Sequence, residues 1–146
     1  MKLLLISDSH SFDLSNICFK EYDYVFHAGD YGKSISCLEK NNIYFVKGNC
    51  DLIGENSKVI ECFGKRILLI HGDAQNVKYG LDRLIYKAME CKVDYCFFGH
   101  THTPTFFQAE NIVFINPGAF PSYVILTQDN IGFYHKGSKE IKEVKW

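Results

Sequence analysis

Arginine is scarce in this chain, and several common signals are missing altogether. The 146 residues include only two arginines, Arg66 and Arg83, so no cluster of bidentate arginines is available to bind phosphate groups. The formal net charge of −1 gives no broad basic surface, which argues against long nucleic acid as a partner. Any phosphate chemistry would therefore need another source of positive charge, and metal ions are the obvious one.

Long apolar runs are also absent, so we expect no membrane-spanning segment and no membrane partner. The first residues, MKLLLIS, are too short for the apolar part of a signal peptide, and polar residues follow without a cleavage site. We interpret them as a buried strand of a cytoplasmic protein.

Six cysteines are present, but no pair has the C-x-x-C spacing of zinc knots or redox sites. Without a secretory signal, we expect reduced and mostly buried thiols. Cys50 stands apart, because it lies in a polar cluster with Asn49 and Asp51.

Apolar runs alternate with helical patterns in the first half of the chain, which is typical of βαβ units with parallel strands. Strands are expected at 2–7, 24–30 and 43–49, with helices at 11–21 and 33–41. In the middle of the chain, the pattern predicts a hairpin over 58–72 that turns at 63–65, followed by an amphipathic helix over 79–91 and a strand over 94–100. Near the C-terminus it predicts hairpins over 105–118 and 123–136 and an edge strand over 136–146. The length favours one domain, residues 1–146.

Five of the expected strands end in polar clusters. These are Asp8-Ser9-His10, Gly29-Asp30, Gly48-Asn49-Cys50-Asp51, His71-Gly72-Asp73 and Gly99-His100-Thr101-His102. Because the carboxyl ends of strands in open α/β sheets meet at one edge, we expect the clusters to share a site. Carboxylates, imidazoles and an amide form the mixed ligand set of Mn, Fe, Co, Ni or Zn ions. The seven candidate ligands are Asp8, His10, Asp30, Asn49, His71, His100 and His102, enough for two ions that share a carboxylate.

Spacing within two clusters suggests how such ligands could be arranged. In an extended segment, residues i and i+2 share a face, with Cα atoms roughly 6.5 Å apart. On that geometry Asp8 and His10 can hold one ion, while His100 and His102 can reach different ions. Each cluster alone is more typical of a turn or a satisfied polar group. The five together predict a metal centre.

Three other polar residues have simpler interpretations. His27 is expected to be a core histidine that bonds a neighbouring group, and His135 a surface residue of the last hairpin. Asp51 is expected to cap backbone amides.

The order D-x-H, G-D, G-N-x-D, H-G and G-H-T-H resembles the calcineurin-like metallophosphoesterase superfamily. With MKLLLISDSH, HAGD, GNCD and GHTHTP followed by NPG, the chain is most similar to its small YfcE-like phosphodiesterase branch, over nearly its whole length. The resemblance implies a four-layer α/β/β/α sandwich of two mixed sheets flanked by helices. It also implies that Asp8, His10, Asp30 and His102 hold one ion, and that Asp30, Asn49, His71 and His100 hold the other.

The activity implied by the resemblance is hydrolysis of a small phosphodiester by a hydroxide that bridges two divalent ions, with Mn the first choice. Asn49 and His71 would contact the phosphate or support the metal site.

Two departures from relatives stand out. Cys50 occupies the place of a histidine that protonates the leaving group in many of them, and a thiol of ordinary pKa is a poor general acid. Ala119 replaces a common serine after NPG, with the loss of a hydrogen bond near the site as the expected effect.

Two alternatives stay open: a phosphomonoesterase, and a non-catalytic metal-binding or scaffold protein with the same fold. Scaffold members of the superfamily usually lack a metal-site histidine, whereas this chain keeps every one. The expected partner is a small phosphoester substrate, and apolar positions among the many aromatics could support a homodimer.

Overall fold

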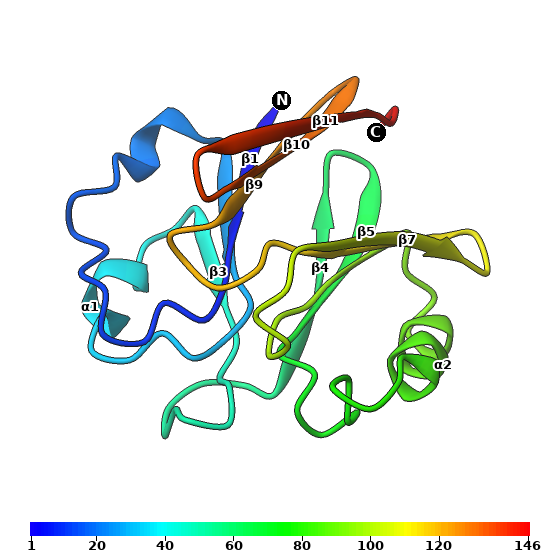
Figure 1. Ribbon diagram of the computed structural model, residues 1–146, viewed down its shortest axis with the longest axis horizontal. Coiled ribbons are helices and arrows are strands. Elements are labelled where there is room, and N and C mark those ends of the chain that lie inside the picture. The colour runs from blue at the N-terminus through cyan, green and yellow to red at the C-terminus, as the bar shows by residue number, and fades with distance from the viewer.

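The computed structural model describes residues 1–146 as two mixed β-sheets packed face to face (Figure 1). The first sheet has the order β11-β10-β9-β1-β2-β3, and the second has the order β4-β5-β6-β8-β7. The strands of the first sheet are β1 (Lys2–Ile6), β2 (Tyr24–His27), β3 (Ile43–Phe45), β9 (Tyr123–Thr127), β10 (Asn130–His135) and β11 (Ser138–Glu143). Those of the second are β4 (Ser57–Cys62), β5 (Lys65–Ile70), β6 (Tyr95–Phe97), β7 (Thr105–Ala109) and β8 (Ile112–Asn116).

Parallel strands form one side of the first sheet and the middle of the second. In the first sheet β1 pairs in parallel with β2, with Leu3 opposite Tyr24, and β2 pairs with β3. In the second sheet β6 runs parallel to both β5 and β8. The carboxyl ends of β1, β2, β3, β5 and β6 are the strand ends that carry the polar clusters.

Side chains that point alternately to the two faces of the central strands build the core. Leu3 and Leu5 of β1 pack between the two sheets, while the intervening Leu4 and Ile6 pack on the outer face of the first sheet. The strand β5 is buried on both faces in the same way. Strands covered on both sides can be apolar at every position, which explains the continuous runs LLLI and ILLI.

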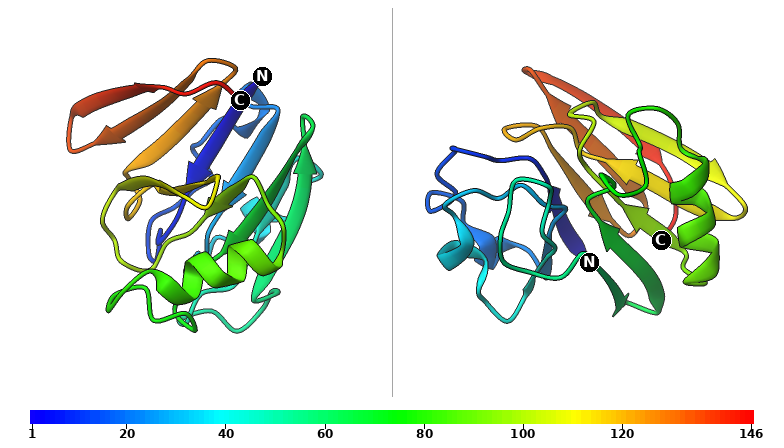
Figure 2. Two further views of the ribbon diagram at one scale, coloured as in Figure 1. Left: turned by 90° about the vertical axis from the view of Figure 1, so that its right-hand side faces the viewer. Right: turned by 90° about the horizontal axis from the view of Figure 1, so that it is seen from below.

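The two outer layers are unequal, as Figure 2 shows. The helix α2 (Asp82–Glu90) places Leu84 and Ala88 on the outer face of the second sheet. The first sheet is covered mainly by loops, together with the short helix α1 (Ile35–Leu38) and the 3₁₀ turn η1 (Phe19–Glu21). The predicted four-layer sandwich is confirmed, with one thin outer layer.

The two helices expected on the first sheet are largely wrong. Between residues 11 and 21 only η1 is helical, because the Asp13 carboxylate accepts a hydrogen bond from the Ser15 amide at 2.9 Å and fixes a local turn. Between residues 33 and 41 only α1 forms. Ser34, at the N-cap position before this helix, donates its hydroxyl to the Phe12 carbonyl at 3.2 Å and makes no side-chain cap.

The expected hairpins and the helix α2 are confirmed, with shorter bounds. The turn between β4 and β5 uses Phe63 and Gly64, and the turn between β7 and β8 uses Glu110 and Asn111, all with positive φ, as tight hairpin turns require. The strand β11 lies at the edge of its sheet, as predicted.

The expectation of mostly buried thiols is wrong, because only Cys62 and Cys96 are buried among the six free cysteines. Neither helix is long and apolar enough to cross a membrane.

Candidate metal centre

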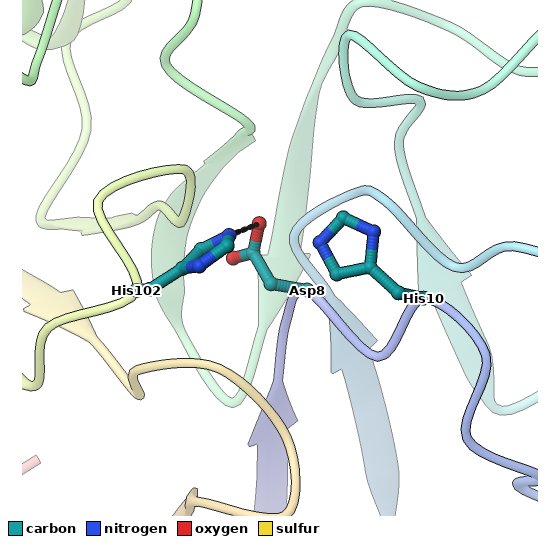
Figure 3. Close-up of side chains that lie close together, drawn as sticks. All are labelled: Asp8, His10 and His102. Carbon is teal, nitrogen blue, oxygen red and sulfur yellow. Dashed lines mark ion pairs between the residues drawn. The ribbon is translucent and has the colours of Figure 1, made fainter.

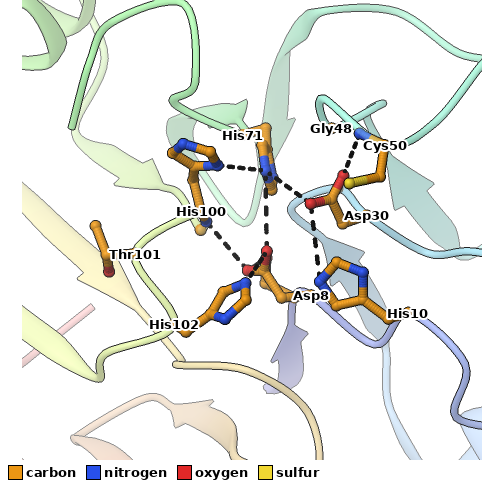
Figure 4. Close-up of polar contacts among 12 residues, drawn as sticks. Asp8, His10, Asp30, Gly48, Cys50, His71, His100, Thr101 and His102 are labelled. Atoms are coloured by element: carbon orange, nitrogen blue, oxygen red, sulfur yellow. Dashed lines mark hydrogen bonds and ion pairs between the residues drawn. The ribbon is translucent and has the colours of Figure 1, made fainter. Parts of the chain in front are cut away.

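The seven candidate residues lie together where the parallel strands of the two sheets end, and Figure 4 labels all of them except Asn49. Asp8 and His10 follow β1, Asp30 follows β2, Asn49 follows β3, His71 follows β5, and His100 and His102 follow β6. Contacts connect them into one set: His102–Asp8 at 3.2 Å, Asp8–His71 at 3.8 Å, His71–Asp30 at 3.3 Å, Asp30–His10 at 3.8 Å, His71–Asn49 at 3.1 Å and His71–His100 at 3.2 Å.

The backbone at five of these positions is left-handed, so the extended geometry expected for the i, i+2 pairs is wrong. Asp8, His10, Asp30, His100 and His102 have φ values of 51°, 43°, 57°, 68° and 62°. Residues other than glycine seldom adopt such angles, and they gather at functional sites where the surrounding structure imposes them. Backbone hydrogen bonds between loops impose them here: the Asp8 amide donates to the Gly29 carbonyl and the His10 amide to the Asp30 carbonyl, both at 2.9 Å.

Asp8 directs one carboxylate oxygen at its supports and the other into the site (Figure 3). Its Oδ2 accepts hydrogen bonds from the Ser7 hydroxyl at 2.6 Å and the His100 amide at 3.1 Å. Its Oδ1 is buried, has no hydrogen-bond donor and lies 3.2 Å from Nε2 of His102. The buried Nε2 of His10 also lacks a hydrogen-bond partner. Buried polar atoms without partners are rare, and these two fit a cation between Asp8, His10 and His102.

His71 is held with its second nitrogen facing the site. Its Nδ1 lies 2.7 Å from the Ala28 carbonyl and donates to it, which leaves the lone pair of Nε2 free in the neutral ring. Around Nε2 lie two acceptors, Oδ1 of Asn49 and Oδ2 of Asp30, together with Nδ1 of His100, which donates or accepts according to its tautomer. Acceptors facing acceptors require a proton or a metal ion between them.

The pKa of His71 shows how strongly this arrangement attracts positive charge. Burial acts to lower the pKa of His71, but the hydrogen bond with Asp30 and the charges of Asp8 and Asp30 outweigh it and raise the pKa above its ordinary value. In contrast, burial and the nearby His71 lower the pKa of His100, so its ring stays neutral and its nitrogens remain available as ligands.

Asp30 is placed between the imidazoles of His10 and His71. Burial acts to raise the pKa of Asp30, but hydrogen bonds from His71 and from the Cys50 amide, at 2.9 Å, prevail and lower it to about 2. The side chain is therefore an ionised carboxylate with one oxygen bonded to backbone and one facing the site. Such a group suits a shared ligand of two ions.

Glycines let these carboxylates come close to neighbouring backbone. A Cβ atom on Gly48 would lie 2.1 Å from Oδ1 of Asp30. A Cβ atom on Gly99 would lie 2.1 Å from Oγ of Ser7 and 2.7 Å from Oδ2 of Asp8. Larger residues at either position would displace a candidate ligand.

Asp51 and His27 have the structural roles predicted for them. The Asp51 carboxylate accepts hydrogen bonds from the amides of Asp30 at 2.7 Å and Gly48 at 2.8 Å, so it caps two loops at once. His27 is fully buried, accepts the Gly29 amide on Nδ1 at 3.1 Å and contacts the Ser9 hydroxyl through Nε2 at 2.8 Å. Both of its ring nitrogens are therefore in use.

Sequence reasoning missed two supporting residues, Ser7 and Asn116. Asn116 is fully buried and donates its side-chain amide to the Gly99 carbonyl and the Thr101 hydroxyl, both at 3.0 Å, while its Oδ1 accepts the Gly118 amide at 2.9 Å. It thus fixes the loop that carries His100 and His102. The NPG motif at the end of β8 was the available signal, because a polar residue at the end of a buried apolar strand needs partners.

The donor set fits divalent metal ions. Two groups of nitrogen and oxygen donors, Asp8–His10–His102 and Asp8–Asp30–His71, each have their ligand atoms within 4.8 Å of one another. A third group, His10–Asp30–Cys50, adds a thiol. Nitrogen and carboxylate ligands without paired thiolates match ions from Mn to Zn and do not match a structural zinc knot.

Known proteins resemble this chain along its whole length. A probable metallophosphoesterase of Bacillus subtilis, YsnB, is 30% identical over 164 residues, which cover 99% of this chain and 97% of the relative. The crystal structure of a Vps29 single mutant from Entamoeba histolytica covers 100% of the chain and 99% of its own, with a TM-score of 0.81 and 20% identity. The structure of an archaeal phosphodiesterase covers 100% of both chains, with a TM-score of 0.64 and 23% identity.

A family profile agrees with these similarities. The profile of the calcineurin-like phosphoesterase superfamily domain matches residues 1–139, which include all seven candidate ligands. Together with the relative from Bacillus subtilis, this match shows that the chain belongs to the calcineurin-like phosphoesterase superfamily.

Proposed function

We propose that this protein is a metal-dependent phosphodiesterase that acts on a small phosphodiester. The observation that carries the proposal is the convergence of seven nitrogen and oxygen donors around buried acceptors that have no hydrogen-bond donor, above all Oδ1 of Asp8. Membership of the phosphoesterase superfamily supports hydrolysis of phosphate esters. The phosphodiesterase among the structures of similar fold favours a diester over a monoester.

The proposed ligands divide into two sets around Asp30. Asp8, His10, Asp30 and His102 would hold one ion, and Asp30, Asn49, His71 and His100 the other. The positions of the rings support this division, since His102 faces Asp8 whereas His100 faces His71 (Figure 4). Manganese is the first choice, and Fe, Co, Ni or Zn also suit the mixed donors.

When bound, divalent ions would supply an activated water and stabilise charge on the phosphoryl oxygens. The side chains supply orientation. Asn49 is exposed and directs its Oδ1 at His71. Its amide nitrogen donates one N–H to Sγ of Cys50 at 3.6 Å, and the second N–H can donate to a phosphoryl oxygen. The two arginines lie elsewhere: Arg66 is engaged by Glu61 and by the carbonyls of Cys91 and Lys92, and Arg83 is exposed on α2, which packs on the outer face of the second sheet.

Cys50 lies where a proton donor for the leaving group would be useful. Burial, followed by the negative charge of Asp30, raises the pKa of the Cys50 thiol, so it stays protonated at neutral pH. A thiol with a raised pKa gives up its proton slowly. We therefore expect the enzyme to prefer esters with good leaving groups.

A scaffold role is the second candidate, because the Vps29 mutant has the same fold. The donor set weighs against it. Five strained backbone positions and an unpartnered buried carboxylate oxygen at one site point to a bound metal ion, which a scaffold without metal does not need.

Hydrolysis of paired synthetic esters tests the proposal. The purified protein, stripped with chelator and reloaded with Mn, should hydrolyse bis(p-nitrophenyl) phosphate faster than p-nitrophenyl phosphate. Chelator and the substitution Asp30→Ala should abolish the activity, whereas Lys145→Ala, on the exposed C-terminal segment, should leave it unchanged. Faster release from the monoester would contradict the diester preference. No hydrolysis of either ester with Mn, Fe, Co, Ni or Zn would favour the scaffold.

A further inference from the structure

A groove of about 830 Å³ begins at His102, beside the candidate metal centre, and leads away from it. It runs between the loop that precedes β9 and the turn that joins β10 to β11, which lie near each other in Figure 1. We call it the hairpin groove, and its main walls are Pro104, Phe120, Tyr123, Tyr134, Lys136 and Lys139. Its size is that of a site for a nucleotide-sized molecule.

One wall of the hairpin groove is aromatic. Tyr123 and Tyr134 are opposite each other on β9 and β10, and their rings stack at 4.7 Å with an interplanar angle of 9°. Both rings are only half-buried, and so is Phe120, which packs edge-on against Phe12 at 5.5 Å. Rigid, partly exposed rings in a concave site favour stacking with a flat ring of a ligand.

The part of the hairpin groove formed by the β10–β11 turn and the start of β11 is basic. Its lining includes Lys136, Lys139 and His135 and contains no aspartate or glutamate. The ion pairs formed by lysine or arginine side chains in this protein are Arg66–Glu61 and Lys142–Glu140, so Lys136 and Lys139 are free of carboxylate partners. The Lys139 ammonium lies 5.6 Å from the centre of the Tyr134 ring, next to the stacked pair. Unpaired positive charge in a concave site attracts anions.

These features, combined in one groove beside the metal centre, describe a ligand. A phosphate ester bound at the metal centre would extend past His102 to the aromatic wall and then to the lysines. Lipid chains do not fit, because the groove is lined by mixed polar and aromatic residues that end in exposed lysines. A flat heterocycle followed by a second anionic group does fit.

We infer that the hairpin groove binds a nucleoside portion of the substrate, with the base on the tyrosine wall and a second phosphate group at Lys136 and Lys139. The inference rests on the proposed function, since it specifies the substrate as a small nucleotide diester that carries an additional phosphate. The inference also assigns substrate specificity to groove residues that are not metal ligands.

Binding of thymidine 3′,5′-bisphosphate to the full chain tests the inference without metal or turnover. Calorimetric titration in chelator should show binding by the wild-type protein. The double variant Lys136→Ala/Lys139→Ala should bind about tenfold more weakly, because two exposed charge contacts are lost. The matched variant Lys145→Ala should bind as the wild type does. Absence of wild-type binding, or equal affinity of the double variant, would overturn the inference.

Variants of the aromatic wall supply a second, independent measurement. Tyr134→Phe keeps the flat ring and should retain the affinity, whereas Tyr134→Leu should weaken binding of the bisphosphate but not of inorganic pyrophosphate, which has no base. Thermal unfolding would establish that both variants fold. Equal affinity of the Phe and Leu variants for the nucleotide would show that the base does not stack on Tyr134.

Failure of the proposed function and failure of the groove are distinguishable. If the wild-type protein hydrolyses bis(p-nitrophenyl) phosphate while the lysine variant binds the bisphosphate normally, the function stands and the groove assignment is wrong. If no ester is hydrolysed while the lysine variant loses nucleotide binding, the groove is a nucleotide site in a protein that is not a phosphodiesterase.

Discussion

Lowering the pH from 7 to 5 should destabilise the folded protein by about 2 kcal/mol through one buried side chain, His27. Burial and the neighbouring His71 lower the pKa of His27 from 6.5 to about 3. Between these two values the unfolded chain binds a proton at this residue and the folded protein does not. Stability is therefore lost as the pH falls below about 6.5.

The magnitude follows from these two pKa values. At pH 5 the unfolded state gains about 25-fold in statistical weight over pH 7 from protonation of His27, which corresponds to about 2 kcal/mol, and the folded state gains almost nothing. A glutamine in place of His27 can still accept from the Gly29 amide and donate to the Ser9 hydroxyl, but it does not titrate.

The assay is urea unfolding of wild type and His27→Gln at both pH values, in chelator so that metal binding makes no contribution. The wild-type protein should lose about 2 kcal/mol more than the variant between pH 7 and pH 5. Other titrating groups, including His71, affect both proteins and cancel in the difference. An equal pH dependence in the two proteins would refute the account of His27 as a neutral, buried support of the site.

Three further substitutions test the packing around the site and the core. Gly99→Ala introduces a methyl group 2.1 Å from Ser7 Oγ, and we expect unfolding measurements to show a loss of about 1–3 kcal/mol, with less metal bound; unchanged stability would contradict the close approach. Asn116→Ala leaves the Gly99 carbonyl without its donor, and should cost about 1–3 kcal/mol and weaken metal binding in a dialysis assay; retained affinity would mean that another group fixes the loop. Leu84→Ala in α2 should cost about 2–5 kcal/mol, whereas the exposed Tyr86→Ala should stay within about 0.5 kcal/mol, and similar losses would refute the assignment of the buried face.

The sequence predicts this fold well wherever apolar patterning is strong. The runs LLLI and ILLI are buried on both faces, and α2 has its apolar residues at helical spacing, so tertiary packing and local pattern agree. The helices expected over 11–21 and 33–41 were wrong because Asp13 and Ser34 use their side chains in turns and loop contacts that a periodicity argument does not count.

The sequence also predicts which residues lie together at the candidate site, but it does not predict the backbone geometry there. Polar residues after parallel strands gather at one sheet edge, which is why Asp8 and His71 meet although they are far apart in the chain. The left-handed φ values of Asp8 and His10 arise from hydrogen bonds to the Gly29–Asp30 loop, which are long-range contacts. The hairpin groove likewise joins His102 to Lys139, residues brought together only by the fold.

Metal content tests the central claim most directly. After equilibrium dialysis against Mn, mass spectrometry should find about two ions per wild-type chain and fewer in His102→Ala and in His100→Ala, which remove ligands proposed for different ions. His135→Ala removes a histidine that is not among the seven proposed ligands, and this variant should bind as many ions as the wild type. Metal content unchanged by loss of either His100 or His102 would contradict a two-ion site built from these residues.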